Sequence, residues 1–335
     1  MQSASPLAKG SRWLVALVAA AAVALTGCGA TDQGDQAPVA DDTRTSVTIT
    51  DNGGEKTIEL PITSYVALDN RTFQTLQSWG LKPAAAARAL MPTTNPWKTD
   101  ESIVDIGNHR EPNLELIAAA QPQVIISGQR FTQFNEKIAE LVPDAIIIDL
   151  DPREGEPFDK ELERQTTVLG EIFNKQDEAA ALNAELDAAI TRAKDAYDPD
   201  TKVMAINASG GNLGFIAPGA GRTLGPVFDI LGLTPALEVE GSSDDHEGDD
   251  ISVEAIAKSN PDLIMVMDRD AAVTEPGAEY TPAADLISNS AALQNVSAVK
   301  TGNIVIMPAD TYTNEGVQTY TTFFNSLADQ LEKKA

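Results

Sequence analysis

The sequence predicts an α/β protein built from two similar lobes that are joined by one long helix. Short β-rich segments alternate with helical segments in both halves of the chain. A long stretch between the halves is almost free of glycine and proline, and a helix–proline–strand pattern occurs once in each half. The part of the chain after residue 45 has about 290 residues, which is enough for two domains of ordinary size.

Residues 1–27 have the pattern of a secretory signal peptide. Two cations precede an apolar run at 13–24, which is too short to cross a bilayer as a mature helix. The run ends in Leu-Thr-Gly-Cys at 25–28, which resembles the lipobox of bacterial lipoproteins. This position favours a lipidated Cys28 at the new N-terminus over a free core cysteine or a nucleophile. The sequence therefore predicts a protein anchored by lipid on the extracytoplasmic face of the cell membrane.

Residues 28–45 are predicted to form a flexible tether, because they are rich in Gly, Ala, Asp and Gln and show no apolar period. The whole chain carries a formal net charge of −26. This charge argues against nucleic acid and against an anionic membrane surface as electrostatic partners. Cys28 is the only cysteine, so the chain can form no intramolecular disulfide.

The first lobe is expected to span residues 46–157. It starts with a predicted hairpin, because β-rich segments at 47–50 and 56–60 flank Asp-Asn-Gly-Gly, whose residues tolerate positive φ. Strands and helices alternate in the rest of the lobe. The predicted strands are 65–68, 123–127 and 145–150, and the predicted helices are 72–79 and 131–141.

The segment 158–198 is predicted to be a linking helix. Only Gly170 interrupts it, apolar residues recur at helical spacing, and Asp-Pro-Asp at 198–200 ends it. A single helix of this length would span about 60 Å, longer than one lobe is wide. The alternative is two shorter helices with a break near Gly170 or at Asn174-Lys175, because glycine weakens a helix interior. In either case the boundary between the lobes falls here.

The second lobe is expected to span residues 199–335 and to repeat the rhythm of the first. The segment Asn113–Ile125 matches Ser252–Ile264, and each copy has the pattern of a capped helix, a proline stop and a buried strand. A recurrence of this length indicates duplicated α/β units. The predicted strands of this lobe are 202–206, 263–267 and 303–307, and the predicted helices are 223–231 and 315–333.

The doubled helix–proline–strand unit resembles the periplasmic binding proteins of ABC importers that take up iron–siderophore complexes, haem or cobalamin. The segments Ile106–Gly107, Glu111–Glu115, Ile125–Arg130 and Val266–Arg269 are most similar to the branch that takes catecholate and mixed-ligand ferric siderophores. The resemblance implies the class III fold, in which two Rossmann-like lobes share one backbone helix and the ligand binds in the cleft with limited hinge closure. It also implies a monomer without a cofactor that binds a ferric siderophore, performs no catalysis, and passes the ligand to ABC transporter permease subunits.

Haem and cobalamin remain alternative ligands within the same fold. A lipid-anchored enzyme and a purely structural envelope lipoprotein are alternatives of other classes. The enzyme alternative has little support, because the sequence contains no G-x-S-x-G elbow, no P-loop and no dinucleotide-binding fingerprint.

Three arginines, Arg130, Arg222 and Arg269, are the main candidates for ligand binding. A ferric catecholate is Fe(III) surrounded by oxygen anions, so its receptor needs fixed cations. Arg130 and Arg269 follow predicted strands, Arg222 follows a glycine-rich loop, and ligands of open α/β sheets bind at the carboxyl ends of strands. The resemblance places all three at basic positions of the siderophore branch, with the spacing of Arg130 off by one. The alternative for each is a surface salt bridge.

His246 and Tyr312 are candidate ligands of the iron. The resemblance places His246 where some relatives offer a histidine to the metal, and Tyr312 follows a predicted strand as a candidate phenolate. A histidine and a tyrosine can fill positions on Fe(III) that a tetradentate chelator leaves open. The alternatives are a solvated loop histidine and a tyrosine that only stacks on the ligand. Two histidines are too few for the multi-histidine sites of zinc importers.

Three aromatic residues, Tyr65, Trp97 and Phe215, are candidates to line the cleft, because aromatic faces pack on catechol rings. Trp97 is favoured because Asn-Pro-Trp lies in a loop-like stretch, whereas core packing is an equal alternative for Tyr65 and Phe215. The second histidine, His109, precedes a helix start, and we assign it no role.

Glu115 and Glu254 hold equivalent places in the two repeat copies, one in each lobe. The resemblance places here the acids that pair with arginines of the permease. The alternative is that each acid only favours its helix N-terminus through the macrodipole, and both roles can coexist.

Overall fold

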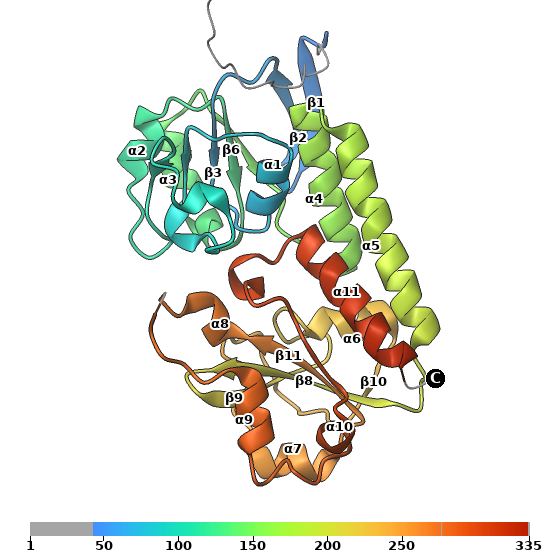
Figure 1. Ribbon diagram of the computed structural model, residues 1–335. Helices are drawn as coiled ribbons and strands as arrows, with labels where there is room; N and C mark the ends of the chain where they lie inside the picture. Colours follow the sequence, from blue (N-terminus) through green and yellow to red (C-terminus); the bar gives the residue numbers. More distant parts are fainter. Residues whose placement is uncertain (1–42, 276, 334–335) are drawn as a thin grey trace, which may run out of the picture. The chain divides into compact units, whose positions relative to one another are not determined.

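The computed structural model describes residues 43–275 and 277–333 (Figure 1). The expected signal peptide, Cys28 and most of the expected tether lie outside the described residues. Within these two ranges, every helix is too short or too polar to span a bilayer.

The first lobe contains a β-hairpin and a parallel sheet. The hairpin pairs β1 (Ser46–Asp51) with β2 (Gly54–Glu59), as its turn residues predict. The sheet has the order β5-β4-β3-β6-β7. Its strands are β3 (Tyr65–Ala67), β4 (Ala85–Ala86), β5 (Val104–Asp105), β6 (Val124–Ser127) and β7 (Ile146–Asp149). Its helices are α1 (Phe73–Ser78), α2 (Leu114–Ala119) and α3 (Asn135–Leu141), with 3-10 turns η1 (Arg88–Leu90), η2 (Pro96–Lys98) and η3 (Gln129–Phe134).

The predicted strands and helices of the first lobe are present, with two differences. Strands β4 and β5 were not predicted, because two residues each are too few to give a periodic signal. The helix predicted at 131–141 begins as the 3-10 turn η3 and becomes α-helical only at Asn135. The residues after β6 therefore turn tightly at the carboxyl end of the sheet.

The second lobe contains a mixed sheet. Four parallel strands have the order β10-β8-β11-β12, and β9 pairs antiparallel with β8. Apolar side chains cover both faces of this sheet in two separate clusters. Its strands are β8 (Lys202–Ser209), β9 (Asn212–Ile216), β10 (Thr234–Pro235), β11 (Leu263–Asp268) and β12 (Ile304–Ile306). Its helices are α6 (Gly225–Leu231), α7 (Val253–Ser259), α8 (Arg269–Val273), α9 (Ala283–Asn289), α10 (Ser297–Thr301) and α11 (Val317–Glu332), with the 3-10 turn η4 (Thr311–Thr313).

The sequence repeat corresponds to a structural repeat. Helix α2 leads into β6 in the first lobe, and α7 leads into β11 in the second. Each helix is followed by a residue with positive φ, Gln121 at 45° and Asn260 at 47°, directly before a proline. A left-handed residue followed by proline ends the helix and directs the chain into the sheet. The predicted duplication of an α/β unit is confirmed.

The prediction of one continuous helix at 158–198 is wrong, and the alternative with a break at Asn174-Lys175 is correct. The segment forms α4 (Phe158–Phe173) and α5 (Gln176–Ala196), which lie side by side in Figure 1. Asn174 has φ 57°, a left-handed conformation that ends α4. A Cβ atom on Gly170 would lie 2.6 Å from Cβ of Ala179, so the glycine permits the close packing of the two helices.

Helices α4 and α5 both connect the lobes. In α4, Leu162 belongs to the core of the second lobe, whereas Leu169 and Ile172 belong to the core of the first. Helix α5 begins against the end of α4. Further along α5, Leu186 and Ile190 belong to the core of the second lobe, where α11 packs on this helix. With 21 residues, α5 is about 31 Å long, half the length expected for a single helix.

Candidate functional site

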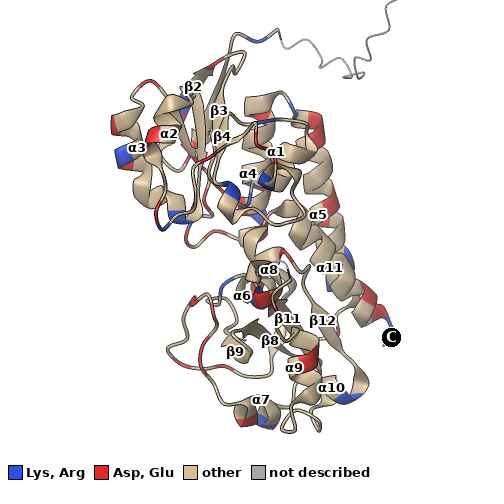
Figure 2. Ribbon diagram, turned by 60° about the vertical axis from the view of Figure 1, so that its left-hand side comes forward, with Lys and Arg blue, Asp and Glu red and all other residues tan. Residues whose placement is uncertain are grey.

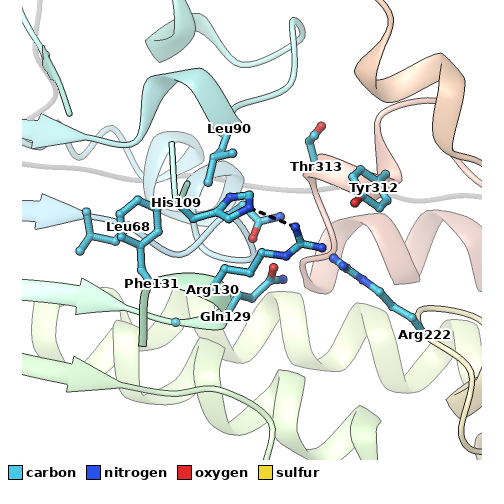
Figure 3. A pocket seen from close by; sticks show the side chains of 11 residues that line it. Leu68, Leu90, His109, Gln129, Arg130, Phe131, Arg222, Tyr312 and Thr313 are labelled. Atoms are coloured by element: carbon cyan, nitrogen blue, oxygen red, sulfur yellow. Dashed lines mark hydrogen bonds between the residues drawn. The ribbon is translucent and has the colours of Figure 1, made fainter. Parts of the chain in front are cut away.

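Three adjoining cavities lie between the lobes, with volumes of about 60, 760 and 410 Å³. We call them the small, large and side cavities, and the three together the cleft. Arg130 lines all three cavities, which shows that they adjoin. Figure 3 shows the small cavity, where Arg130 and Arg222 approach each other from different lobes beside Tyr312.

The cleft is built from segments that follow the carboxyl ends of strands. Arg71 follows β3, Arg130 follows β6, and Arg269 follows β11 directly. Tyr312 lies in η4, shortly after β12. In both sheets the cleft therefore lies at the carboxyl ends of the strands, where ligands of open α/β sheets bind.

Arg222 is held by a buried carboxylate. Its Nη2 lies 2.8 Å from Oε2 of Glu315 and its Nε lies 3.2 Å from Oε1. Burial alone would raise the pKa of Glu315, but the charges of Arg222 and Arg71 and the hydrogen bonds it accepts lower this pKa to about 2. Glu315 is thus ionised at neutral pH and fixes Arg222 at the edge of the small and large cavities.

Glu315 also joins the two lobes. From the second lobe, the hydroxyl of Thr223 donates to Oε1 of Glu315 at 2.5 Å. From the first lobe, Nε2 of Gln129 donates to Oε2 at 3.1 Å, and Nη2 of Arg71 lies 3.9 Å from the same oxygen. The base of the cleft is therefore a network of charged and polar groups drawn from both lobes.

Tyr312 packs against two of the three predicted arginines. The guanidinium carbons of Arg222 and Arg269 each lie 5.0 Å from the centre of its ring, within the range of cation–π interactions. Nη1 of Arg269 donates to Oγ of Ser209 at 3.1 Å, and its buried Nε has no hydrogen-bond partner in the described part of the chain. A buried donor without an acceptor suits a site that receives an acceptor from outside.

Arg130 contacts a histidine and, within the part of the chain that the structure describes, no carboxylate. Its Nη1 lies 3.1 Å from Nε2 of His109, the dashed contact in Figure 3. Burial lowers the pKa of His109, and the positive charges of Arg130, Arg110 and Arg222 lower it further. His109, to which we had assigned no role, therefore belongs to the cleft as a neutral imidazole.

Two acids of the first lobe accompany Arg71. Its Nη1 lies 3.2 Å from Oδ1 of Asp151, and its backbone N–H donates to Oδ1 of buried Asp69 at 2.9 Å. Burial raises the pKa of Asp69 to about 7, an effect that Asp151 reinforces and Arg71 opposes. A Cβ atom at Gly128 would lie 2.5 Å from the Asp69 carboxyl carbon, so this close approach requires glycine.

The two expected iron ligands do not share a cavity. Tyr312 lines the small and side cavities, whereas His246 lines the large one. The ring nitrogens of His246 lie 3.9 Å from carboxylate oxygens of Asp245 and Glu247 in its own loop. Among the residues that the structure describes, no group of three or more His, Cys, Asp and Glu side chains could hold a metal ion.

The expectation that aromatic residues line the cleft is wrong for Tyr65, Trp97 and Phe215. Tyr65 and Trp97 are each 5% exposed in the core of the first lobe, and Phe215 is 1% exposed in that of the second. Tyr65 opens the buried strand β3 and packs edge-on against Phe173 at 4.9 Å. The side chain of Asn95 accepts the Trp97 N–H at 3.0 Å and caps η2, so this loop-like stretch is an ordered turn against the core.

Glu115 and Glu254 lie at the exposed N-terminal turns of α2 and α7. Their equivalence in the two lobes follows from the structural repeat. Acidic residues also lie on other helices of both lobes, for example α9, so exposure alone does not distinguish these two (Figure 2).

Sequence reasoning missed three residues of the candidate site: Arg71 and His109, which line its cavities, and Glu315, which pairs with Arg222. The rule that found Arg130 and Arg269 would also have found Arg71, because this arginine follows the predicted strand 65–68. Glu315 is the first residue of the predicted helix 315–333, but it lies before α11, which begins at Val317. Its pairing with Arg222 joins positions 93 residues apart. No local pattern in the sequence predicts such a contact.

Comparison with known proteins agrees with this architecture. The sequence pattern of a family described as periplasmic binding protein matches residues 66–311. The petrobactin-binding protein YclQ of Bacillus subtilis is 25% identical over 328 residues, covering 95% of this chain and 98% of YclQ. The ferric-anguibactin-binding protein FatB of Vibrio anguillarum is 29% identical over 303 residues, covering 89% of this chain and 90% of FatB.

Solved structures have the same fold. The crystal structure of YclQ superposes with a TM-score of 0.71, covering 86% of this chain and 99% of YclQ at 22% identity. The siderophore-binding protein BauB, solved with two acinetobactin molecules and ferric iron, superposes with a TM-score of 0.73 at 22% identity, covering 85% of this chain and 98% of BauB. The family match over most of the described chain, the duplicated α/β lobes and the cleft at their strand ends lead to one conclusion: this chain belongs to the periplasmic binding protein family.

Proposed function

We propose that this protein captures a ferric siderophore with catecholate groups in the cleft and delivers it to the permease of an ABC importer. The observation that carries the proposal is the convergence of Arg130, Arg222 and Arg269 from both lobes around the ring of Tyr312. The names of the relatives YclQ and FatB, which bind petrobactin and ferric anguibactin, support the same ligand class.

The charge of the protein explains why such a ligand needs a local cluster of cations. The chain as a whole is strongly acidic, so an anionic chelate approaches against a repulsive field. Guanidinium groups offer several N–H donors in a fixed plane, which suits the oxygen anions around Fe(III). Haem and cobalamin remain alternative ligands of the same fold. The burial of Tyr65 and Trp97 in the core leaves the arginines and Tyr312 to carry the recognition of a catecholate.

The N-terminal pattern supports a second part of the proposal: Cys28 carries a lipid that anchors a monomeric binding protein on the extracytoplasmic face of the membrane. We expect Cys28→Ser to move the protein from the membrane fraction to the soluble fraction. A variant that stays with the membrane contradicts the lipid anchor, and a ligand-binding assay on the same material checks that the lobes are folded.

Tyr312 is the proposed phenolate ligand for chelators that leave positions on the iron open, and His246 is the proposed second ligand. These residues line different, adjoining cavities, so a chelate that meets both must extend across the two cavities. Tyr312→Phe should change the charge-transfer absorption of such a complex, and His246→Ala tests the second ligand in the same way. Unchanged spectra in both variants would remove both residues from the iron site.

Fluorescence titration with a panel of ferric complexes tests the main proposal. The panel contains tris-catecholate, bis-catecholate, citrate-type and hydroxamate complexes, together with haem and cobalamin. We expect the catecholates to bind most tightly and to be recovered unchanged, as binding without catalysis requires. Tighter binding of haem or cobalamin would show that the proposed ligand is wrong. Chemical conversion of a bound siderophore would indicate an enzyme. If none of the complexes binds, the remaining alternative is a structural lipoprotein.

A further inference from the structure

Arg130 differs from the other arginines of the cleft in its partner. Arg222 pairs with Glu315 at 2.8 Å, Arg71 pairs with Asp151 at 3.2 Å, and Arg269 approaches Asp270 at 4.0 Å. Among the described residues, no carboxylate lies within ion-pair distance of Arg130, and its side chain contacts His109 instead. The positive charge of Arg130 is therefore held in place without an adjacent negative charge.

The chemistry of the two groups fixes the direction of the contact. A guanidinium group has donors and no acceptor, so Nη1 of Arg130 donates and Nε2 of His109 accepts at 3.1 Å. The proton of the neutral imidazole must then be on Nδ1. In this tautomer Nδ1 is a donor, so it cannot accept from Arg130. It is buried and has no hydrogen-bond partner among the described residues.

The surroundings keep His109 an acceptor. Arg130, Arg110 and Arg222 act on it electrostatically, and burial also favours the neutral ring. His109 also lines the side cavity, whose other lining residues include the cations Lys98 and Arg269 and one acidic residue, Glu275. Cations outnumber acids around the ring, so an imidazolium would be disfavoured there.

We propose that His109 is a positioning residue, which aims the Arg130 guanidinium into the cleft through a hydrogen bond to a neutral acceptor and leaves its charge available to an anionic ligand. A carboxylate at this position would orient Arg130 equally well but would cancel the charge that the ligand needs. A neutral acceptor removes the rotamer freedom of the arginine before binding, so less entropy is lost when the ligand arrives. This inference rests on the proposed function only for the identity of the ligand.

Two variants of His109 distinguish the loss of its hydrogen-bond acceptor from the loss of its side-chain volume. His109→Leu removes the acceptor, whereas His109→Gln can place its side-chain oxygen near the position of Nε2. The probe is the ferric complex of a bis(dihydroxybenzamide) with a saturated alkyl linker. We expect His109→Leu to weaken binding about fivefold to tenfold and His109→Gln to remain within about twofold of the wild type. In an Arg130→Ala background, His109→Leu should cause no further loss. The positioning role is overturned if His109→Leu lowers the affinity as much in the Arg130→Ala background as in the wild type. It is also overturned if His109→Gln binds the probe as weakly as His109→Leu.

NMR tests the pairing without any ligand. The chain has two histidines, so His246→Gln in a protein made without a histidine tag leaves the imidazole signals of His109 alone. We expect the Nδ1–H tautomer and a pKa of His109 below its ordinary value, which Arg130→Ala raises. The Nε2–H tautomer, or a pKa of His109 that does not respond to Arg130→Ala, overturns the inference. If the wild type binds no ferric catecholate, the proposed function fails while this experiment still decides the pairing.

Discussion

Arg222 and Glu315 form a bidentate ion pair at the base of the cleft, with Nε–Oε1 and Nη2–Oε2 distances of 3.2 and 2.8 Å. The carboxylate is buried and also accepts from Thr223 of the second lobe and Gln129 of the first. A single acid thus orients a predicted ligand-binding arginine and connects the two lobes. The arginine cluster is organised before any ligand arrives.

Replacement of Glu315 by glutamine tests this ion pair. Removing one partner of a buried pair leaves the other charge uncompensated, so we expect Glu315→Gln to lower the free energy of unfolding by about 3 kcal/mol at neutral pH. Because the folded-state pKa of about 2 lies below the ordinary value, this stabilisation is present above about pH 4.5 and is lost as the pH falls toward 2. Urea unfolding at several pH values measures both effects.

The control is the exposed ion pair of Arg192 with Glu332, which is also bidentate, at 2.9 and 2.6 Å. Solvent screens this pair, so Glu332→Gln should change stability far less. A loss in Glu315→Gln no larger than that in Glu332→Gln would contradict the structural role of Glu315.

Each of the three predicted arginines should contribute to ligand affinity. Hydrogen bonds to charged groups are worth about 1.5–3 kcal/mol, so alanine at Arg130, Arg222 or Arg269 should weaken binding of a ferric catecholate about tenfold to a hundredfold. Arg192→Ala, which lies outside the cleft, is the matched control and should bind like the wild type. The proposed site is in the wrong place if any two of the three arginines can be replaced without loss of affinity for every ferric catecholate tested.

Asp69 gives stability an unusual pH dependence. Burial raises its pKa to about 7 in the folded state, above its value in the unfolded chain, so the folded state retains the proton more strongly. The contribution of Asp69 to stability is therefore present at low pH and is lost as the pH rises from about 4 to about 7. Asp69→Asn, which stays neutral, should remove this loss.

Urea unfolding between about pH 5 and about pH 8 measures the slope for wild type and variant. Asp285→Asn, on the exposed surface of α9, serves as the control. Parallel pH profiles for the wild type and Asp69→Asn would show that Asp69 is ionised throughout this range.

Glu115 and Glu254 are predicted to dock the protein on its permease. Both are exposed at the first turns of equivalent helices, one in each lobe. Lysine at both positions should abolish uptake of the ferric siderophore by cells and leave the affinity of the purified protein unchanged. Glu136→Lys with Asp285→Lys makes the same charge change at first turns outside the repeat, on α3 and α9. Uptake that survives in the Glu115 and Glu254 variant, or is lost equally in the control, would contradict docking.

The sequence by itself determined the two-lobed α/β plan, because hydrophobic periodicity and turn residues act over a few neighbouring positions. The three arginines that it predicts for ligand binding, Arg130, Arg222 and Arg269, line cavities between the lobes, and their binding role stays a prediction. The sequence did not decide between one linking helix and two, because Gly170 and Asn174 allow a break but do not require it. The close packing of Gly170 in α4 against Ala179 in α5 is a tertiary contact that holds the two helices side by side.

The tertiary structure alone decided which polar groups meet. The partner of Arg222 lies 93 residues away in the chain, and that of Arg130 lies 21 residues away in a loop. Such contacts depend on the register of strands and on the angle between lobes, which no local pattern encodes. The same reason placed Trp97 in the core, because the burial of a side chain depends on what packs over it and not on the composition of its own segment.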